Sequence, residues 1–275
     1  MTLLQGPIAI TGAGGHLGTW LQRRLVLYAN EVRPLERGDD LRGAFRSAAA
    51  VVHLAGSLAP EAHETYESAN VETARAVAAA LDGSSVRRVV FLSHLGASPL
   101  ARNDYLRTKG QAEEILLAAG RETTIFRCSY VYGPPDDPGP SFTPFLAHGE
   151  KPVSVPGDGT QRIAPVFVED VVSAVLRAAI DLTAPVGTYE LTGPDTLTLD
   201  AFLETLNHGH VHERHLPSLL ARALSHLVRE LRPALVEVLL ADSLPTGLPS
   251  AAAAFRLDLH HVDDVFGRFG TTVAA

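Results

Sequence analysis

The chain has 275 residues, of which 46% are hydrophobic, and a formal net charge of -8 at pH 7. This length suffices for one large α/β domain, or for one domain with a small satellite, and the negative charge argues against nucleic acid as the main partner. No apolar run approaches the ~20 residues of a membrane-spanning helix, and residues 1–7 lead directly into a strand pattern. We therefore expect no membrane contact, no signal peptide and a cytoplasmic protein.

The few cysteines and lysines of the chain indicate which of these residues can have a chemical role. The single cysteine, Cys128, excludes an internal disulfide, fits a reducing compartment and lies in an apolar run typical of a buried, unreactive thiol. Lysine occurs only at Lys109 and Lys151, against 21 arginines. A chain that avoids lysine but keeps one at position 109 makes that position a candidate functional residue.

The first element is an apolar strand over residues 8–11, followed by glycines and a helix over 16–27. The turn has the pattern Gly12-x-x-Gly15-x-x-Gly18. Gly12 permits the tight turn, Gly15 lets a pyrophosphate approach the backbone, and Gly18 lets the helix pack closely on the sheet. Because the helix N-terminus offers free N–H groups to the phosphates, this pattern predicts a dinucleotide site.

A second strand over 30–35 ends in Glu36-Arg37-Gly38-Asp39. An acidic residue there binds both ribose hydroxyls of NAD, whereas an arginine favours the 2′-phosphate of NADP. Both kinds of residue are present, so the cofactor is NAD or NADP, and Glu36 favours NAD.

The following segments alternate between helices and buried strands. We expect helices over 41–47, 70–81, 104–119 and 171–180, and strands over 50–56, 88–93 and 123–130. Residues 133–140 are too rich in proline and glycine for regular structure. Beyond them, a short strand over 189–191 and helices over 199–206, 217–231 and 233–241 indicate a smaller lobe.

This order predicts an α/β fold, a Rossmann-type doubly wound parallel sheet with a small C-terminal substrate lobe. We assign residues 1–185 to the nucleotide-binding core, with a substrate-facing insertion over 134–165, and residues 186–275 to the lobe.

Within the helix over 104–119, Tyr105 and Lys109 are spaced i, i+4 and share one face. Taken with the other motifs, this pair resembles the extended and atypical branches of the short-chain dehydrogenase/reductase superfamily, the epimerase/dehydratase-like proteins. The matching stretches are Thr11-Gly12-x-x-Gly15-x-x-Gly18, residues 52–56, residues 70–73, Tyr105-x-x-x-Lys109, Arg127-x-Ser129-x-Val131-Tyr132-Gly133, Gly157-Asp158-Gly159, residues 168–171 and Gly193-Pro194. The run over 93–97 looks most like the branch related to an accessory subunit of respiratory complex I.

The resemblance implies how the pair would act. In the family, the tyrosine exchanges a proton with the substrate while hydride passes to or from the nicotinamide, and the lysine binds the ribose and stabilises the phenolate. Tyr105, Lys109 and Ser93 are therefore the expected catalytic residues. His94 would lie near the nicotinamide, as a proton carrier or as a structural histidine.

Two departures from the family pattern bear on function. Active extended members usually carry serine or threonine where this chain has Leu95, so Ser93 or Ser98 substitutes for it or the hydroxyl is missing. Nucleotide-sugar enzymes tend to carry an arginine where Ile163 falls, with Arg162 one residue away, so the sequence does not identify a nucleotide sugar as the substrate.

We therefore expect an NAD(P)-dependent oxidoreductase or epimerase-like enzyme acting on a small hydroxyl or carbonyl substrate, as a monomer or homodimer. The alternative is a non-catalytic NAD(P)-binding redox sensor or assembly factor, which Leu95 favours. The expected cofactor-binding residues are Gly12, Gly14, Gly15, His16, Leu17, Gly18, Glu36, Arg37, Asp39, Leu54, Ala55, Gly56, Asn70 and Lys109.

A histidine-rich tract lies in the expected lobe, with histidines at 208, 210, 212 and 215. Alternating histidines on a strand edge could bind a metal. No carboxylate or cysteine pattern completes such a site in the sequence, so we expect a solvated loop and no metal.

Overall fold

The computed structural model describes residues 3–29, 31–60, 64–149, 151–225 and 232–270. The chain forms two compact units, each built from several segments. The first comprises Met1–Cys128, Glu169–Leu191 and Thr246–Asp258, and the second comprises Ser129–Val168, Thr192–Pro245 and Leu259–Ala275. The segments of the two units interleave along the chain. The assignment of residues 1–185 to a nucleotide-binding core and of residues 186–275 to a lobe, which we made from the sequence, stays a prediction.

A six-stranded parallel sheet forms the centre of the first unit, in the order β10-β5-β4-β3-β1-β2. Its strands are β1 (Ile8–Thr11), β2 (Val32–Leu35), β3 (Ala50–His53), β4 (Arg88–His94), β5 (Glu122–Cys128) and β10 (Gly187–Leu191). The strand order reverses at β1, which lies between β2 and β3. Such a reversal is the place where doubly wound sheets bind ligands, beside the carboxyl ends of the strands. The predicted Rossmann-type fold is confirmed.

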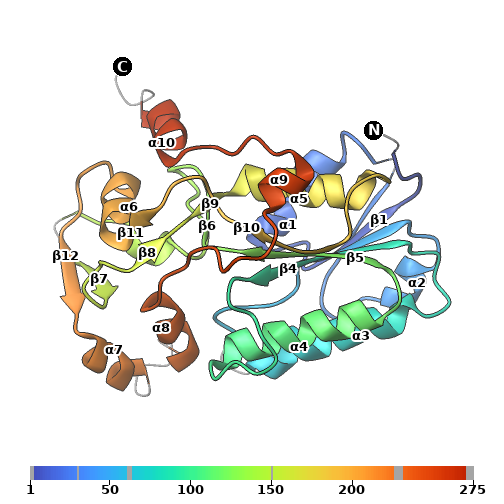
Figure 1. Cartoon of the computed structure of the whole chain (residues 1–275), viewed down its shortest axis with the longest axis horizontal. Helices are drawn as coiled ribbons and strands as arrows, with labels where there is room; N and C mark the ends of the chain where they lie inside the picture. The colour runs from blue at the N-terminus through green and yellow to red at the C-terminus, as the bar shows by residue number, and fades with distance from the viewer. Residues whose placement is uncertain (1–2, 30, 61–63, 150, 226–231, 271–275) are drawn as a thin grey trace. The chain divides into compact units, whose positions relative to one another are not determined.

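Helices cover both faces of this sheet (Figure 1). On one face lie α2 (Leu41–Phe45), the π-helix η1 (Glu67–Glu72), α3 (Thr73–Leu81) and α4 (Asp104–Ala118); on the other lie α1 (His16–Leu25), α5 (Val168–Ile180) and α9 (Ala251–Phe255). The strands are buried over their whole length in β1, β3 and β4 because both faces are covered. Val51 of β3 and Val89 of β4 pack with apolar residues of α3 and α4 in one core.

The described part of the second unit contains three two-stranded ribbons and several short helices. The ribbons pair β6 (Val131–Tyr132) with β9 (Val166–Phe167), β7 (Val153–Pro156) with β12 (Glu213–Leu216), and β8 (Arg162–Ile163) with β11 (Leu197–Thr198). The helices are η2 (Thr143–Phe145), α6 (Leu199–Leu206), α7 (Ser218–Ser225), α8 (Pro233–Leu239) and α10 (Val262–Gly270). Aromatic rings of Tyr132, Phe142 and Phe202 pack together at its centre.

Several elements differ from the sequence predictions. The strand expected over 189–191 in the small lobe is part of β10, which pairs in parallel with β5 in the main sheet. The helix expected from residue 70 begins as the π-helix η1, and the strand expected over 50–56 ends at His53 because the chain turns at Gly56, where φ is +147°. Part of the helix expected over 217–231 lies outside the described residues. Among the described residues, no helix is long and apolar enough to cross a membrane.

Candidate active site

The glycine turn between β1 and α1 is shaped by close backbone contacts. Gly12 has a positive φ of +72°, and a Cβ on it would lie 2.7 Å from the backbone nitrogen of Ala55. A Cβ on Gly18 would lie 2.4 Å from the carbonyl oxygen of Ala13. Gly15 is the N-cap of α1, and among the described residues beyond its chain neighbours a Cβ there would meet the carbonyl oxygen of Gly12 alone, at 3.3 Å. Gly12 and Gly18 therefore allow close packing of the backbone, where a larger residue would clash. The space beside Gly15 suits a pyrophosphate at the start of a helix.

Gly18→Ala is expected to destabilise the protein by about 1–3 kcal/mol, because the added methyl meets two backbone carbonyls that cannot move independently. Gly267→Ala is the matched control, since Gly267 lies in α10 and a Cβ there meets nothing within 4 Å among the described residues. Helix propensity alone makes that control neutral or slightly stabilising. Urea unfolding of both variants measures the difference, and equal stabilities would contradict a close contact at Gly18.

Glu36 follows β2 and its carboxylate reaches the glycine turn. A Cβ on Gly14 would lie 2.7 Å from Oε1 of Glu36. The backbone N–H of Glu36 donates to the carboxylate of Asp39 at 2.8 Å, which holds the loop after β2. Arg37 forms an ion pair with Glu64. The carboxylate beside the phosphate-binding turn therefore belongs to Glu36, while the guanidinium of Arg37 is held by another acidic group.

The loop after β3 meets η1 and α4 through Asn70. The buried Asn70 accepts a hydrogen bond from the backbone N–H of Ser57 at 3.2 Å, and its amide donates to Thr108 Oγ1 at 3.1 Å. A Cβ on Gly56 would lie 2.7 Å from Oδ1 of Asn70 and 3.6 Å from Nζ of Lys109. The predicted residues Gly56, Asn70 and Lys109 thus come together at one end of the sheet.

Three other predicted cofactor residues lie nearby in different surroundings. The side chains of Leu17 and Leu54 line a small apolar cavity with residues of α5, so a contact from either residue to a cofactor would come from its backbone. His16 begins α1, and its ring lies 6.5 Å from that of Trp20.

Lys109 is buried on the face of α4 that packs against the sheet. Its Nζ donates to the carbonyl oxygen of Leu92 at 2.5 Å and lies 4.0 Å from the ring centroid of Phe91. Burial lowers the pKa of Lys109 from 10.5 to about 8, while the negative charge of Glu113 opposes that shift. A buried ammonium is costly unless it has an anionic or strongly polar partner.

Glu113 lies one helical turn beyond Lys109 and is held by Arg127 of β5. Nε of Arg127 donates to Oε1 of Glu113 at 3.0 Å, and Nη2 donates to Oε2 at 2.6 Å. This bidentate ion pair holds the Glu113 carboxylate in place one helical turn beyond Lys109. Burial raises the pKa of Cys128 to about 12, which keeps it a neutral thiol, as the sequence suggested.

Tyr105 lies on the same face of α4 as Lys109, as its spacing predicted, and it is buried. Its ring lies 5.5 Å from that of His94 and 6.0 Å from that of Tyr66. Nδ1 of His94 donates to the carbonyl oxygen of Leu95 at 2.7 Å, and burial lowers the pKa of His94 to about 4. His94 is therefore neutral at physiological pH and supports the tyrosine ring.

The side chains of Ser93 and Leu95 bear on whether the site has a hydroxyl group for the substrate. Ser93 Oγ is buried and has no hydrogen-bond partner among the described residues. Leu95 is also buried, and its backbone N–H donates to the carbonyl oxygen of Cys128. The hydroxyl at Ser93 thus makes no hydrogen bond to the described residues, whereas the side chain at position 95 is apolar.

Sequence reasoning missed Thr108, Gly110, Glu113 and Arg127 as parts of this site. A Cβ on Gly110 would lie 2.2 Å from backbone of Ser98, so this glycine brings α4 against the loop after β4. A glycine inside a helical pattern is the signal that could have revealed this close approach. Arg127 appeared only as part of a family motif.

The chain matches the family model described as NAD dependent epimerase/dehydratase family over residues 8–189. The chain belongs to this family. Membership confirms the suspected resemblance, and it agrees with the nicotinamide dinucleotide expected at the glycine turn.

Curated relatives include a reductase and subunits of NADH dehydrogenase. The chain is 32% identical over 171 residues to the mitochondrial NADH dehydrogenase [ubiquinone] 1 alpha subcomplex subunit 9 of Arabidopsis thaliana, and the match covers 61% of this chain and 42% of that protein. It is 28% identical over 210 residues to the ceramide reductase of Caulobacter vibrioides, covering 68% of this chain and 65% of that protein. The matches thus span less than two thirds of either relative's length.

Solved structures of epimerases share the fold. The UDP-glucuronic acid 4-epimerase of Bacillus cereus, in complex with UDP-glucuronic acid and NAD, has a TM-score of 0.71 at 15% identity and covers 95% of this chain and 96% of that one. A short-chain dehydrogenase/reductase superfamily protein of Agrobacterium tumefaciens with bound NAD has a TM-score of 0.69 at 17% identity and covers 96% of each chain. At these identities the likeness shows the fold alone.

Proposed function

We propose that this protein is an NAD-dependent oxidoreductase or epimerase-like enzyme that acts on a small hydroxyl or carbonyl substrate. The observation that carries the proposal is the buried ammonium of Lys109. It lies beside Asn70 and Gly56, and Gly56 follows the carboxyl end of β3, the strand next to β1, where the strand order reverses. A cofactor ribose is the kind of polar partner that would compensate its burial. A reductase among the relatives supports the same chemistry.

The residues present fit a dinucleotide. The α1 N-terminus and Gly15 would hold the pyrophosphate, Glu36 the adenosine ribose, and Lys109 the nicotinamide ribose. The bound nicotinamide would supply or accept the hydride. The Tyr105 hydroxyl would give a proton to the substrate oxygen or take one from it, and the positive charge of Lys109 would stabilise the phenolate. Ser93 Oγ would hold the substrate oxygen by a hydrogen bond.

The choice of NAD over NADP rests on Glu36. Its carboxylate at the glycine turn would accept hydrogen bonds from two ribose hydroxyls and would repel a 2′-phosphate. The isosteric variant Glu36→Gln is expected to lose about tenfold or more in NADH affinity, the value of a charge-assisted hydrogen bond, and to gain affinity for NADPH. Calorimetry with both nucleotides measures this, and Glu31→Gln, which removes a carboxylate before β2, serves as the control. Tighter binding of NADPH than NADH by the wild type would reverse the assignment.

A second candidate function is supported by Leu95 and by the relatives that are subunits of NADH dehydrogenase. In this case the protein would bind the nucleotide tightly without turnover and act as a redox sensor or assembly factor, with a partner protein in place of a substrate. Mass spectrometry of the nucleotide that copurifies, followed by a panel of small ketones, sugars and quinones, separates the two. Tight binding with no turnover on any member of the panel favours the second candidate.

Cell fractionation tests the predicted cytoplasmic location.

A further inference from the structure

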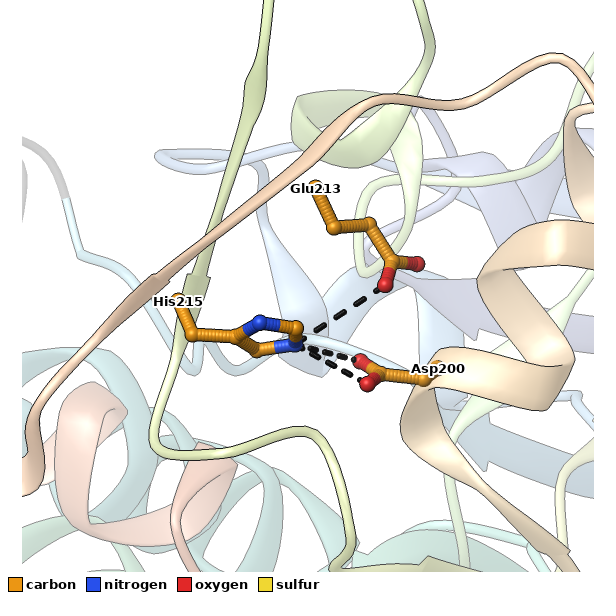
Figure 2. Close-up of side chains that lie close together, drawn as sticks. All are labelled: Asp200, Glu213 and His215. Carbon is orange, nitrogen blue, oxygen red and sulfur yellow. Dashed lines mark hydrogen bonds and ion pairs between the residues drawn. The ribbon is translucent and has the colours of Figure 1, made fainter.

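A cluster of three side chains of types that ligate metals lies in the second unit, outside the proposed dinucleotide site. Asp200 comes from α6, and Glu213 and His215 come from β12. One potential ligand atom from each of the three lies within 4.8 Å of the other two. Figure 2 shows the imidazole of His215 pointing toward both carboxylates. The cluster includes one histidine of the tract that the sequence suggested was a solvated loop.

The backbone holds these side chains in place before any ligand arrives. Residues 213 and 215 are two apart on a strand and therefore share one face. The strand β12 is paired along its length with β7, with Glu213 opposite Val153 and His215 opposite Val155. Asp200 lies in the first turn of α6, and a Cβ on Gly159 would lie 1.8 Å from its Oδ1, so the Asp200 carboxylate lies directly against that glycine.

The distances are close to those of a tetrahedral metal site. Nε2 of His215 lies 2.9 Å from Oδ2 of Asp200 and 3.8 Å from Oε2 of Glu213. Zinc bonds of about 2.0–2.2 Å to nitrogen and oxygen place neighbouring ligand atoms roughly 3.3 Å apart. Shifts of about half an ångström in these two distances would bring them to that spacing, and a fourth position would be left to water.

Charge at the cluster favours a cation. The other oxygen of Glu213, Oε1, is buried and has no hydrogen-bond partner among the described residues. A buried carboxylate oxygen without a partner is costly. Asp158 and Glu204 add further negative charge to the surroundings. Arg214 lies on the opposite face of the strand by alternation.

From this geometry we propose that Asp200, Glu213 and His215 form a binding site for a zinc-like divalent cation. One imidazole and two carboxylates are ligands that Zn²⁺ accepts, with one coordination position left open. Bound metal would join α6 to β12 and stabilise the second unit, because an ion that binds only the folded chain shifts the unfolding equilibrium. The site is independent of the proposed dinucleotide chemistry.

The test is titration of the chelator-treated full-length protein with Zn²⁺, followed by calorimetry and thermal unfolding. We expect one Zn²⁺ per chain and a rise in melting temperature. His215→Asn and Glu213→Gln are each expected to weaken binding by about tenfold or more and to abolish that rise. His212→Asn is the matched control, because His212 belongs to the same tract and is exposed like His215, but it is not one of the three clustered side chains.

Glu213→Gln keeps the shape of the side chain and leaves the hydrogen bond between His215 and Asp200 in place, so it separates a metal site from a simple ion pair. Circular dichroism verifies that each variant is folded. No Zn²⁺ binding by the wild type would overturn the proposal. So would equal binding by Glu213→Gln, or a loss in His212→Asn as large as that in His215→Asn. Binding of Mg²⁺ as tight as that of Zn²⁺ would overturn it too, since Mg²⁺ prefers oxygen ligands and would indicate an acidic surface only.

Discussion

Tyr105→Phe is expected to lower the turnover number by about 10²–10⁴ on whichever substrate the wild type accepts, the typical effect of losing a general acid or base. The substitution removes only the hydroxyl. The ring keeps its contacts with His94 and Tyr66, so the fold and the nucleotide affinity should change little. The measurement is the change in NADH absorbance under saturating substrate and cofactor.

Tyr66→Phe is the matched control for this experiment. Its ring neighbours that of Tyr105, but its hydroxyl donates to the carbonyl oxygen of Leu58 at 3.0 Å and is therefore engaged within the protein. We expect its turnover to stay near the wild-type value. Equal rates for the wild type and Tyr105→Phe would show that the proton passes through another group, with Ser93 the next to test.

A wild type that binds NADH tightly but turns over nothing would direct attention to position 95. Leu95→Ser would then restore the hydroxyl that active extended members carry. Appearance of turnover in that variant would mean that this chain keeps the family's machinery but lacks one group. Continued inactivity would support the sensor or assembly role.

The sheet and its glycine turn could be predicted from sequence because their signals are local. The strand over 8–11 and the helix over 199–206 have the predicted bounds, since apolar alternation and helical spacing operate over a few residues. The shared face of Tyr105 and Lys109 follows from helix periodicity alone. That these two residues act in catalysis stays a prediction.

Contacts between distant segments could not be predicted in this way. The ion pair of Glu113 with Arg127 joins a helix to a strand, and nothing in the local pattern links the two residues. The strands of the second unit are as short as two residues, which is too short for a period to show. The cluster around His215 forms because Glu213 and His215 share one face of β12 and Asp200 comes to them from α6, and this approach of a helix to a strand has no local signal in the sequence.

Lys109→Met is expected to weaken NADH binding by about 10–100-fold, the loss of one or more charge-assisted hydrogen bonds, and to lower turnover because Tyr105 loses its neighbouring positive charge. The wild-type affinity should fall as the pH rises through about 8, where the ammonium of the nucleotide-free protein loses its proton. The variant has no such group, so its affinity should be flat over the same interval. Calorimetry across this pH range measures both.

The same substitution should affect stability in the opposite direction. Burial lowers the pKa of Lys109 below that of the unfolded chain, so the unfolded state binds the proton more tightly. The cost of burying the ammonium is fully present below about pH 8 and is relieved as the pH rises from about 8 toward 10.5, which makes the stability contributed by this group increase with pH. Without nucleotide, Lys109→Met should therefore gain most relative to the wild type at neutral pH, and its advantage should shrink in alkali.

Lys151→Met is the natural control, because the chain has no third lysine and Lys151 is exposed. It should leave affinity, turnover and stability near the wild-type values. It also leaves Lys109 as the single lysine, so selective isotope labelling of lysine gives one side-chain amine that NMR can titrate directly. A midpoint near 8 that rises when NADH is added would support an ammonium poised for the cofactor ribose. An unshifted midpoint near 10.5, with or without nucleotide, would show that Lys109 is solvated in solution and would remove the basis for its role.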